Sequence, residues 1–368
     1  MSTLVYGLHD LETIKDERVE QVGISEWNDR ITEWNAEHNR VFNAIMGTFT
    51  QRDPSWNTTP IMKYYTPAAS KMQPVDEHGV AKPMREKGSY QIGLPMWRRE
   101  ASIGLSYEAM KKITIAEMSR QLQMVERADL HTHIELFLFS LFYEENWTFV
   151  STEDNLPDIP VKALANGDAI TYTVRGNDTA PQTADHYVAS ASDIATSDPF
   201  PNIKDTLTKY AGTSANDRIV SFVGGTTNIN QIKALDGFYR TDRTQFTDWG
   251  DNVSLVDPSA DTFIGMGDEV LGEHEEGVLV VRWRKLPANY ILSFNLDAEA
   301  PIGIREDSTP SLQGLFPIDA IENSGNTILN RFRRKIGFAP VNRTAAMVNY
   351  VGVSGTYAEP TAYASIPA

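Results

Sequence analysis

The sequence contains no cysteine among its 368 residues. This absence excludes a disulfide scaffold, a thiolate metal site, an iron–sulfur cluster and a cysteine nucleophile, and it is compatible with a reducing cytosol. Long apolar runs are also missing, because the longest, residues 136–143, is interrupted by Ser140 and flanked by glutamates. A transmembrane helix needs about 20 apolar residues, so a membrane-spanning function is excluded.

Basic side chains are scarce. The chain has 33 Lys and Arg against 49 Asp and Glu, a formal net charge of −16, and residues 151–310 alone carry 12 basic and 25 acidic side chains. Neutralisation of phosphate by cations supplies much of the affinity for nucleic acids, so the chain is expected to repel DNA. The N-terminus lacks the basic start and apolar stretch of a signal peptide, which predicts a soluble, unexported protein.

One apolar stripe stands out in residues 1–57. Its members follow one another at spacings of three and four residues: Ile24, Trp27, Ile31, Trp34, His38, Val41 and Ile45. This spacing predicts an amphipathic helix. Two interpretations stay open: the helix lies on its own domain, or the segment is an arm that docks on another subunit.

Two strand-like segments, residues 61–66 and 89–105, enclose a polar stretch rich in proline, glycine and charge. The pattern predicts a long hairpin. Because an isolated two-stranded hairpin is marginally stable in water, we expect it to lie on another surface, such as a second copy of the chain. Trp97 is expected either to anchor such a contact or to pack under its own hairpin.

Residues 106–143 contain neither proline nor glycine and predict a single long helix, amphipathic in its middle and apolar on all sides at its end. His131, His133 and Glu135 do not match a metal-binding motif, and His131 and Glu135 are expected to form an ordinary polar pair four residues apart.

The rest of the chain alternates short β-type runs with turns, which predicts an α+β class. A helix is expected near residues 199–210, a strand–turn–helix around Gly224 and Gly225, and two strands turned near Pro287. Residues 273–276 are expected to form a solvated acidic turn. No GxSxG, GxGxxG or GxxxxGK[ST] pattern is present, so we expect no enzyme and no catalytic, cofactor-binding or metal site.

The order of these parts resembles the major capsid proteins of tailed bacteriophages, which have the Hong Kong ninety-seven type fold. The segments that carry the resemblance are SYQIGLPMWRREASIGL, the long helix, RIVSFVGGTTNINQIKAL and GFAPVNRTAAMVNYVGV. It implies an N-terminal arm (1–57), an extended hairpin or E-loop (58–104), a spine helix with the first part of the peripheral P-domain (105–210), an axial A-domain (211–310) and a return to the P-domain (311–368).

The resemblance also implies a function. Copies would assemble as hexamers and pentamers into an icosahedral shell around double-stranded DNA that is not specifically bound, located in the virion and assembled in the host cytoplasm. Further partners would be a portal, a separate scaffolding protein and a decoration protein. The candidate intersubunit contacts are Trp27, Trp34, Lys71, Lys82, Arg85, Lys87, Trp97, Arg98, Arg99 and Glu100. Some members of the family cross-link through an E-loop lysine, and Lys63 also lies in this segment, but lysines there serve solubility as well.

Two alternatives remain. Within the same fold, the chain could form an encapsulin-like bacterial compartment that encloses an enzyme cargo. From another class, it could be an α+β enzyme or a carbohydrate-binding protein that uses the acidic region 236–277, with calcium as a conceivable ligand.

Overall fold

The computed structural model describes residues 24–65, 89–106, 112–151, 158–183, 186–239, 269–323 and 327–367. The chain divides into two compact units. Unit 1 is drawn from Met1–Ala44, Met96–Leu136 and Glu306–Gly337, and unit 2 from Ile45–Pro95, Phe137–Arg305 and Phe338–Ala368. No helix in the described part of the chain is long and apolar enough to cross a membrane.

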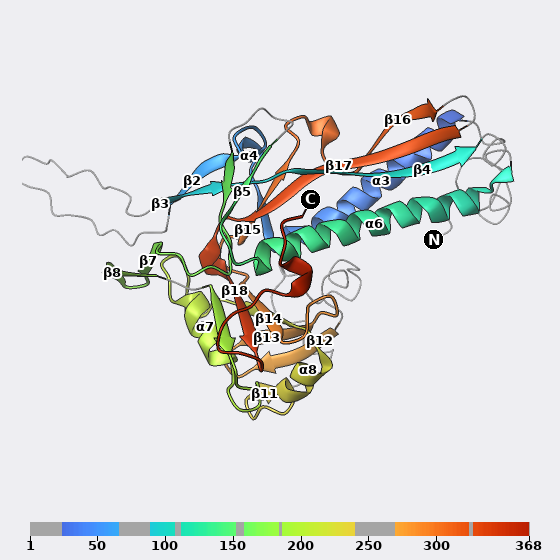
Figure 1. Ribbon diagram of the computed structural model, residues 1–368. Coiled ribbons are helices and arrows are strands. Elements are labelled where there is room, and N and C mark those ends of the chain that lie inside the picture. Colours follow the sequence, from blue (N-terminus) through green and yellow to red (C-terminus); the bar gives the residue numbers. More distant parts are fainter. Residues whose placement is uncertain are drawn as a thin grey trace, which may run out of the picture. The chain divides into compact units, whose positions relative to one another are not determined.

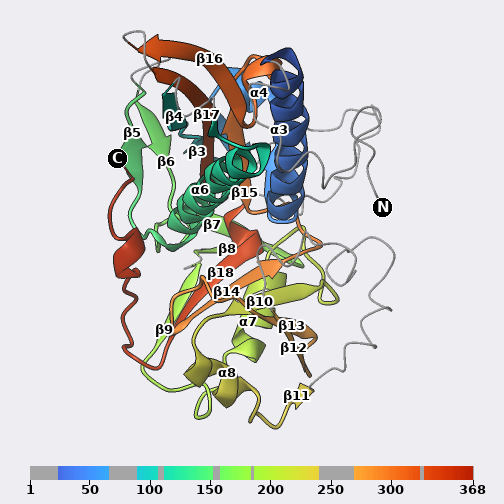
Figure 2. The same cartoon turned by 90° about the vertical axis from the view of Figure 1, so that its right-hand side faces the viewer.

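Within the described residues, unit 1 contains three antiparallel strands and two long helices. Strand β17 (Thr327–Pro340) pairs with β4 (Trp97–Ser106) on one side and with β16 (Phe316–Asn323) on the other. Helices α3 (Ile24–Gly47) and α6 (Ile115–Phe142) lie beside these strands, as Figures 1 and 2 show, although the last residues of α3, α6 and β17 belong to unit 2. A short 3-10 turn, η2 (Pro310–Leu312), precedes β16.

The core of unit 1 lies between the two helices and one face of the sheet. Its buried members are Ile31, Ile103, Ile113, Met118, Leu122, Val125, Leu315 and Phe332. Trp34 is partly buried against this core, and Ile31 comes from the same stripe of α3. These described members of the stripe therefore pack on their own chain, as the first of the two interpretations predicts.

Helix α6 begins later than the sequence pattern predicts. Strand β4 continues to Ser106, and the helix starts at Ile115. The Thr114 hydroxyl accepts a hydrogen bond from the backbone N–H of Glu117, and the Glu117 carboxylate accepts one from the N–H of Thr114. This reciprocal arrangement is a capping box, which satisfies two N–H groups at the helix end. From Leu136 to Phe142 every residue is buried, as predicted.

Unit 2 is centred on a seven-stranded sheet with the strand order β11-β12-β13-β10-β14-β18-β9 (Figure 2). The strands are β9 (Tyr187–Ser190), β10 (Ile219–Val223), β11 (Phe238–Tyr239), β12 (Glu269–His274), β13 (Val278–Arg282), β14 (Tyr290–Asn295) and β18 (Ala346–Val351). Helices α7 (Phe200–Thr208) and α8 (Thr226–Ile232) pack on one face. On the other face, the ring of Phe49 contacts Phe222 and Phe294 at centroid distances of 5.4 and 4.5 Å. Burial of both faces explains why β10 is apolar except for Ser221, whose hydroxyl is hydrogen-bonded to that of Ser293.

Strands β13 and β14 both form where the sequence predicts them, but they do not pair with each other. Strand β10 lies between them, parallel to β13 and antiparallel to β14. The turn from β10 into α8 is tight, as expected: Gly225 has φ +77°, and a Cβ on Gly224 would lie 2.3 Å from the carbonyl oxygen of Leu286. Glycine is required at this point because no larger residue fits.

The base of the predicted hairpin is present in unit 2. Strands β2 (Ile61–Tyr65) and β3 (Ser89–Gly93) pair antiparallel, and their buried side chains, among them Tyr90 and Ile92, join an aromatic-rich core. The base of the hairpin therefore lies on its own chain, whereas its tip, residues 66–88, is outside the described residues. The other elements are β1 (Thr50–Arg52), α4 (Pro54–Thr58), β5 (Trp147–Phe149), β6 (Ile159–Val161), β7 (Thr171–Val174), β8 (Asn177–Thr183), β15 (Ile302–Glu306), η3 (Arg343–Ala345) and η4 (Thr361–Tyr363).

Candidate functional site: a buried ionic cluster and a charged sheet face

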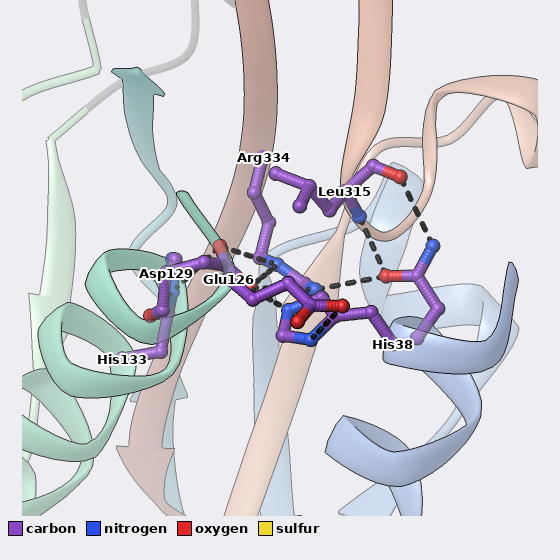
Figure 3. A network of polar contacts seen from close by, with 7 residues as sticks. His38, Glu126, Asp129, His133, Leu315 and Arg334 are labelled. Atoms are coloured by element: carbon purple, nitrogen blue, oxygen red, sulfur yellow. Dashed lines mark hydrogen bonds and ion pairs between the residues drawn. The ribbon is translucent and has the colours of Figure 1, made fainter. Parts of the chain in front are cut away.

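A buried carboxylate on α6 lies at the centre of unit 1. Asp129 accepts a hydrogen bond from Nε2 of His38 on α3 at 2.8 Å and from Nε of Arg334 on β17 at 2.9 Å (Figure 3). His133, one turn further along α6, contacts the backbone carbonyl of Asp129 through Nδ1 at 2.6 Å, and because a carbonyl only accepts, Nδ1 donates. One carboxylate thus ties two helices to the central strand.

Arg334 makes two further contacts beside the one to Asp129. Its Nη2 donates to Oδ1 of Asn39 at 2.8 Å, and its guanidinium lies 4.0 Å from the centre of the Phe42 ring. Asn39 in turn donates to the carbonyl of Leu315 at 3.0 Å and accepts from the N–H of Leu315 at 2.8 Å, so it fixes the turn before β16. A planar guanidinium with five donors suits such a crossing point.

The surroundings of Asp129 and Glu126 shift the pKa values of these two carboxyl groups in opposite directions. Burial by itself would raise the pKa of Asp129, but the hydrogen bonds from His133 and His38 and the charge of Arg334 outweigh it and hold this pKa well below its ordinary value. Glu126 lies 3.7 Å from Nδ1 of His38, and partial burial raises the pKa of this carboxyl group. Asp129 is therefore ionised at neutral pH and its charge is matched by Arg334.

This depressed pKa predicts how the stability of the protein depends on pH. A carboxyl group whose pKa is lower in the folded state contributes stability above its ordinary pKa of about 3.9, and that contribution is lost as the pH falls toward the folded value. We expect the difference in unfolding free energy between the native protein and the Asp129→Asn variant to be constant from pH 6 to 7 and to shrink below about pH 4. Urea unfolding at several pH values measures this difference; a difference that stays flat down to about pH 2 contradicts the assignment.

Several candidate contact residues lie on the sheet of unit 1. Glu100 on β4 accepts a hydrogen bond from Nε of Arg333 at 2.6 Å and lies 3.4 Å from Arg331 and 3.6 Å from Arg98. Burial alone would raise the pKa of Glu100, but the hydrogen bond from Arg333 and the surrounding positive charges lower it. Arg98, with 48% of its side chain exposed, is the most open of these four residues.

The other candidate residues are placed differently. Trp97 is 7% exposed, which favours the interpretation that it packs within its own chain. Arg99 is partly buried on the helix-covered face of the sheet, and Trp34 is partly buried in the core of unit 1. Trp27 lies in α3, but its side chain is outside the described residues, as are Lys71, Lys82, Arg85 and Lys87. Lys63, on β2, is exposed.

The motifs considered for metal binding have structural roles. His131 and Glu135 form an exposed pair at 3.3 Å on α6, which confirms the sequence prediction. The predicted acidic turn is present and Glu275 and Glu276 at its tip are exposed, whereas His274 ends β12, is buried against the ring of Phe200 and lies 3.0 Å from the carboxylate of Asp198. In the described part of the chain, no group of three or more His, Cys, Asp or Glu residues is arranged to hold a metal ion.

Sequence reasoning missed the Asp129 cluster. His38 and Asp129 are 91 positions apart, and Arg334 is 205 positions from Asp129. The signal that was present is a polar residue at an apolar position: His38 falls within the stripe of α3, and Asp129 lies near the apolar positions of α6. A charged residue that is buried requires a partner, so each of these positions predicts an opposite charge without locating it.

Comparison with known proteins places the fold. No family model and no curated protein matches the sequence. Among solved structures, a chain of Mycobacterium phage Patience is similar over 99% of this chain and 98% of its own length, with a TM-score of 0.64 and 16% identity. The capsid of Ralstonia phage GP4 is similar over 85% of this chain and 89% of its own, with a TM-score of 0.50 and 12% identity. The mixed α+β fold of this chain is therefore that of the phage major capsid proteins of the Hong Kong ninety-seven type, as the order of its sequence segments predicts.

Proposed function

We propose that this chain is the major capsid protein of a tailed phage, which assembles as hexamers and pentamers into an icosahedral shell around double-stranded DNA. The observation that carries the proposal is the likeness to the Mycobacterium phage Patience chain over nearly the full length of both chains. The likeness to the capsid of Ralstonia phage GP4 supports the same role. In this proposal the protein is located in the virion, and the shell assembles in the host cytoplasm.

The net charge of the chain supports a role in enclosing DNA more than a role in binding it. At −16 it repels phosphate, so DNA would be confined by the shell and not held by tight contacts. Many modest contacts between identical copies add up to a stable lattice, because each further contact in a closed assembly is intramolecular in effect. The division into N-arm, E-loop, P-domain and A-domain at the predicted boundaries belongs to this proposal, as do the portal, scaffolding and decoration partners.

Sedimentation of the purified full chain, followed by negative-stain electron microscopy of the heaviest fraction, tests the proposal. Rings of five or six copies, tubes or closed shells are the expected products. A chain that remains a monomer across a range of salt and crowding conditions overturns it, and a calcium-dependent rise in melting temperature would then favour the binding-protein alternative. Shells that capture a cargo peptide in the lumen would indicate an encapsulin-like compartment.

The scaffolding partner is tested separately. If a separate scaffolding protein sets the size of the shell, expression of this chain alone should give tubes, open sheets or shells of mixed diameter. Closed shells of one diameter, formed by the chain alone, contradict that part of the proposal and leave the capsid role intact.

A further inference from the structure

The pairing register of β4 and β17 sorts their side chains onto two faces. Directly opposed residues in an antiparallel pair point to the same side of a sheet, and neighbours along a strand alternate. Glu100 is opposite Arg333, and Arg98 is opposite Lys335, so these four residues share one face, and Arg331, two residues from Arg333, shares it too. We call this set, Arg98, Glu100, Arg331, Arg333 and Lys335, the basic sheet face.

The opposite face of the same strands is covered by its own chain. Phe332 and Ile103 belong to the core of unit 1, and Arg334 is 1% exposed in the ionic cluster. The basic sheet face, by contrast, keeps its charged side chains partly open. Their exposed fractions are 48% for Arg98, 30% for Glu100, 29% for Arg331, 23% for Arg333 and 18% for Lys335.

The sign of this face differs from that of the whole chain. Among the described side chains, it carries four cations against Glu100 and one flanking carboxylate, Asp307, which lies 3.2 Å from Lys335. The excess of two positive charges is local, because the chain as a whole has a net charge of −16. Glu100 lies within 3.6 Å of three guanidinium groups, so a single carboxylate faces three cations. The face is therefore an ordered positive patch on an acidic molecule.

We propose that the basic sheet face binds an acidic surface on a second copy of this chain. The inference rests on the proposed function, because assembly supplies the second copy. Complementary charge is present in every copy, since residues 151–310 carry 25 acidic and only 12 basic side chains. Exposed charges of opposite sign steer association and fix its register. Double-stranded DNA is the weaker candidate, because two excess charges compete with the repulsion from the rest of the chain.

The experiment compares charge reversals of equal size at different places on the full chain. Arg98→Glu changes the basic sheet face, whereas Arg40→Glu on α3 and Arg127→Glu on α6 change the net charge by the same amount at exposed positions elsewhere. Sedimentation at several protein concentrations and salt levels gives the concentration at which assemblies form. We expect Arg98→Glu to raise this concentration at least tenfold at low salt, both controls to change it less than threefold, and added salt to weaken native assembly.

A milder variant separates loss of contact from loss of folding. Arg98→Gln removes the charge without introducing repulsion, and it should raise the assembly concentration by a smaller factor while the circular dichroism spectrum and melting temperature stay native. The inference is overturned if Arg98→Glu assembles like the two controls while the native protein forms shells, an outcome that leaves the capsid role standing. It is also overturned if Arg98→Glu specifically abolishes retention of a DNA duplex and leaves assembly unchanged. A native chain that never assembles overturns the proposed function itself.

Discussion

Replacing Asp129 with alanine should lower the free energy of unfolding by about 3–5 kcal/mol. Removing one partner of a buried ion pair leaves the other charge without compensation, and that penalty dominates. Here the abandoned group is Arg334, which is 1% exposed and has its Nε and Nη2 within 2.9 Å of the lost carboxylate. In the same change His38 loses its hydrogen-bond partner, and Nδ1 of His133 loses its 3.2 Å contact with the carboxylate but keeps the backbone carbonyl.

Urea unfolding of the unassembled chain, followed by tryptophan fluorescence, measures this effect. Glu135→Ala is a matched control, because Glu135 lies on the same helix and also faces a histidine, but 55% of its side chain is exposed. Surface ion pairs contribute about 0–1 kcal/mol, so the control should shift the unfolding free energy by less than about 1 kcal/mol. Equal effects of the two substitutions would show that the buried cluster does not contribute to the stability of the protein.

Replacing Gly224 with alanine should destabilise the protein by about 3 kcal/mol, at the upper end of the range for overpacking. The new methyl group would lie 2.3 Å from the carbonyl oxygen of Leu286 and 2.6 Å from that of Pro287. Both obstacles are backbone atoms, so relief requires the loop between β13 and β14 to move away from β10. The seven-stranded sheet, which has β10 between these two strands, resists such a movement.

Gly355→Ala is the control for this substitution. Nothing lies within 4 Å of a Cβ built on Gly355, and its φ is outside the left-handed region. We expect its free energy of unfolding to stay within about 0.5 kcal/mol of the native value. If Gly224→Ala unfolds at the same urea concentration as Gly355→Ala, the turn is not as rigid as the structure indicates.

The parts of the fold that the sequence predicts are those set by neighbouring residues. The stripe of α3 and the all-apolar end of α6 follow from spacing alone, and the turn at Gly224 and Gly225 follows from the change from an apolar run to a helical pattern. The fold class rests on the order of such segments, which also carries the resemblance to phage capsid proteins. Local patterns therefore suffice for the elements and for their sequence along the chain.

What the sequence does not predict depends on residues far apart in the chain. Nothing local places β10 between β13 and β14, because register and strand order follow from the packing of both sheet faces. The partners of His38 and Arg334 lie on other elements, so the cluster around Asp129 emerges only when α3, α6 and β17 meet. The later start of α6 is marked by the capping box of Thr114 and Glu117. The spacing of these two residues is visible in the sequence, but it identifies the start of the helix only once β4 is known to extend to Ser106.

The pairing of β4 with β17 and of β9 with β18 also governs when the protein can fold during its synthesis. Residues 187–190 pair with residues 348–351, and residues 97–106 pair with residues 327–336. A ribosome releases the later partners long after the earlier ones, so both sheets stay incomplete on the nascent chain until then. A product that terminates early keeps an unpaired strand edge and never forms the basic sheet face. A copy truncated before β17 therefore lacks the surface that is proposed above to bind a second copy.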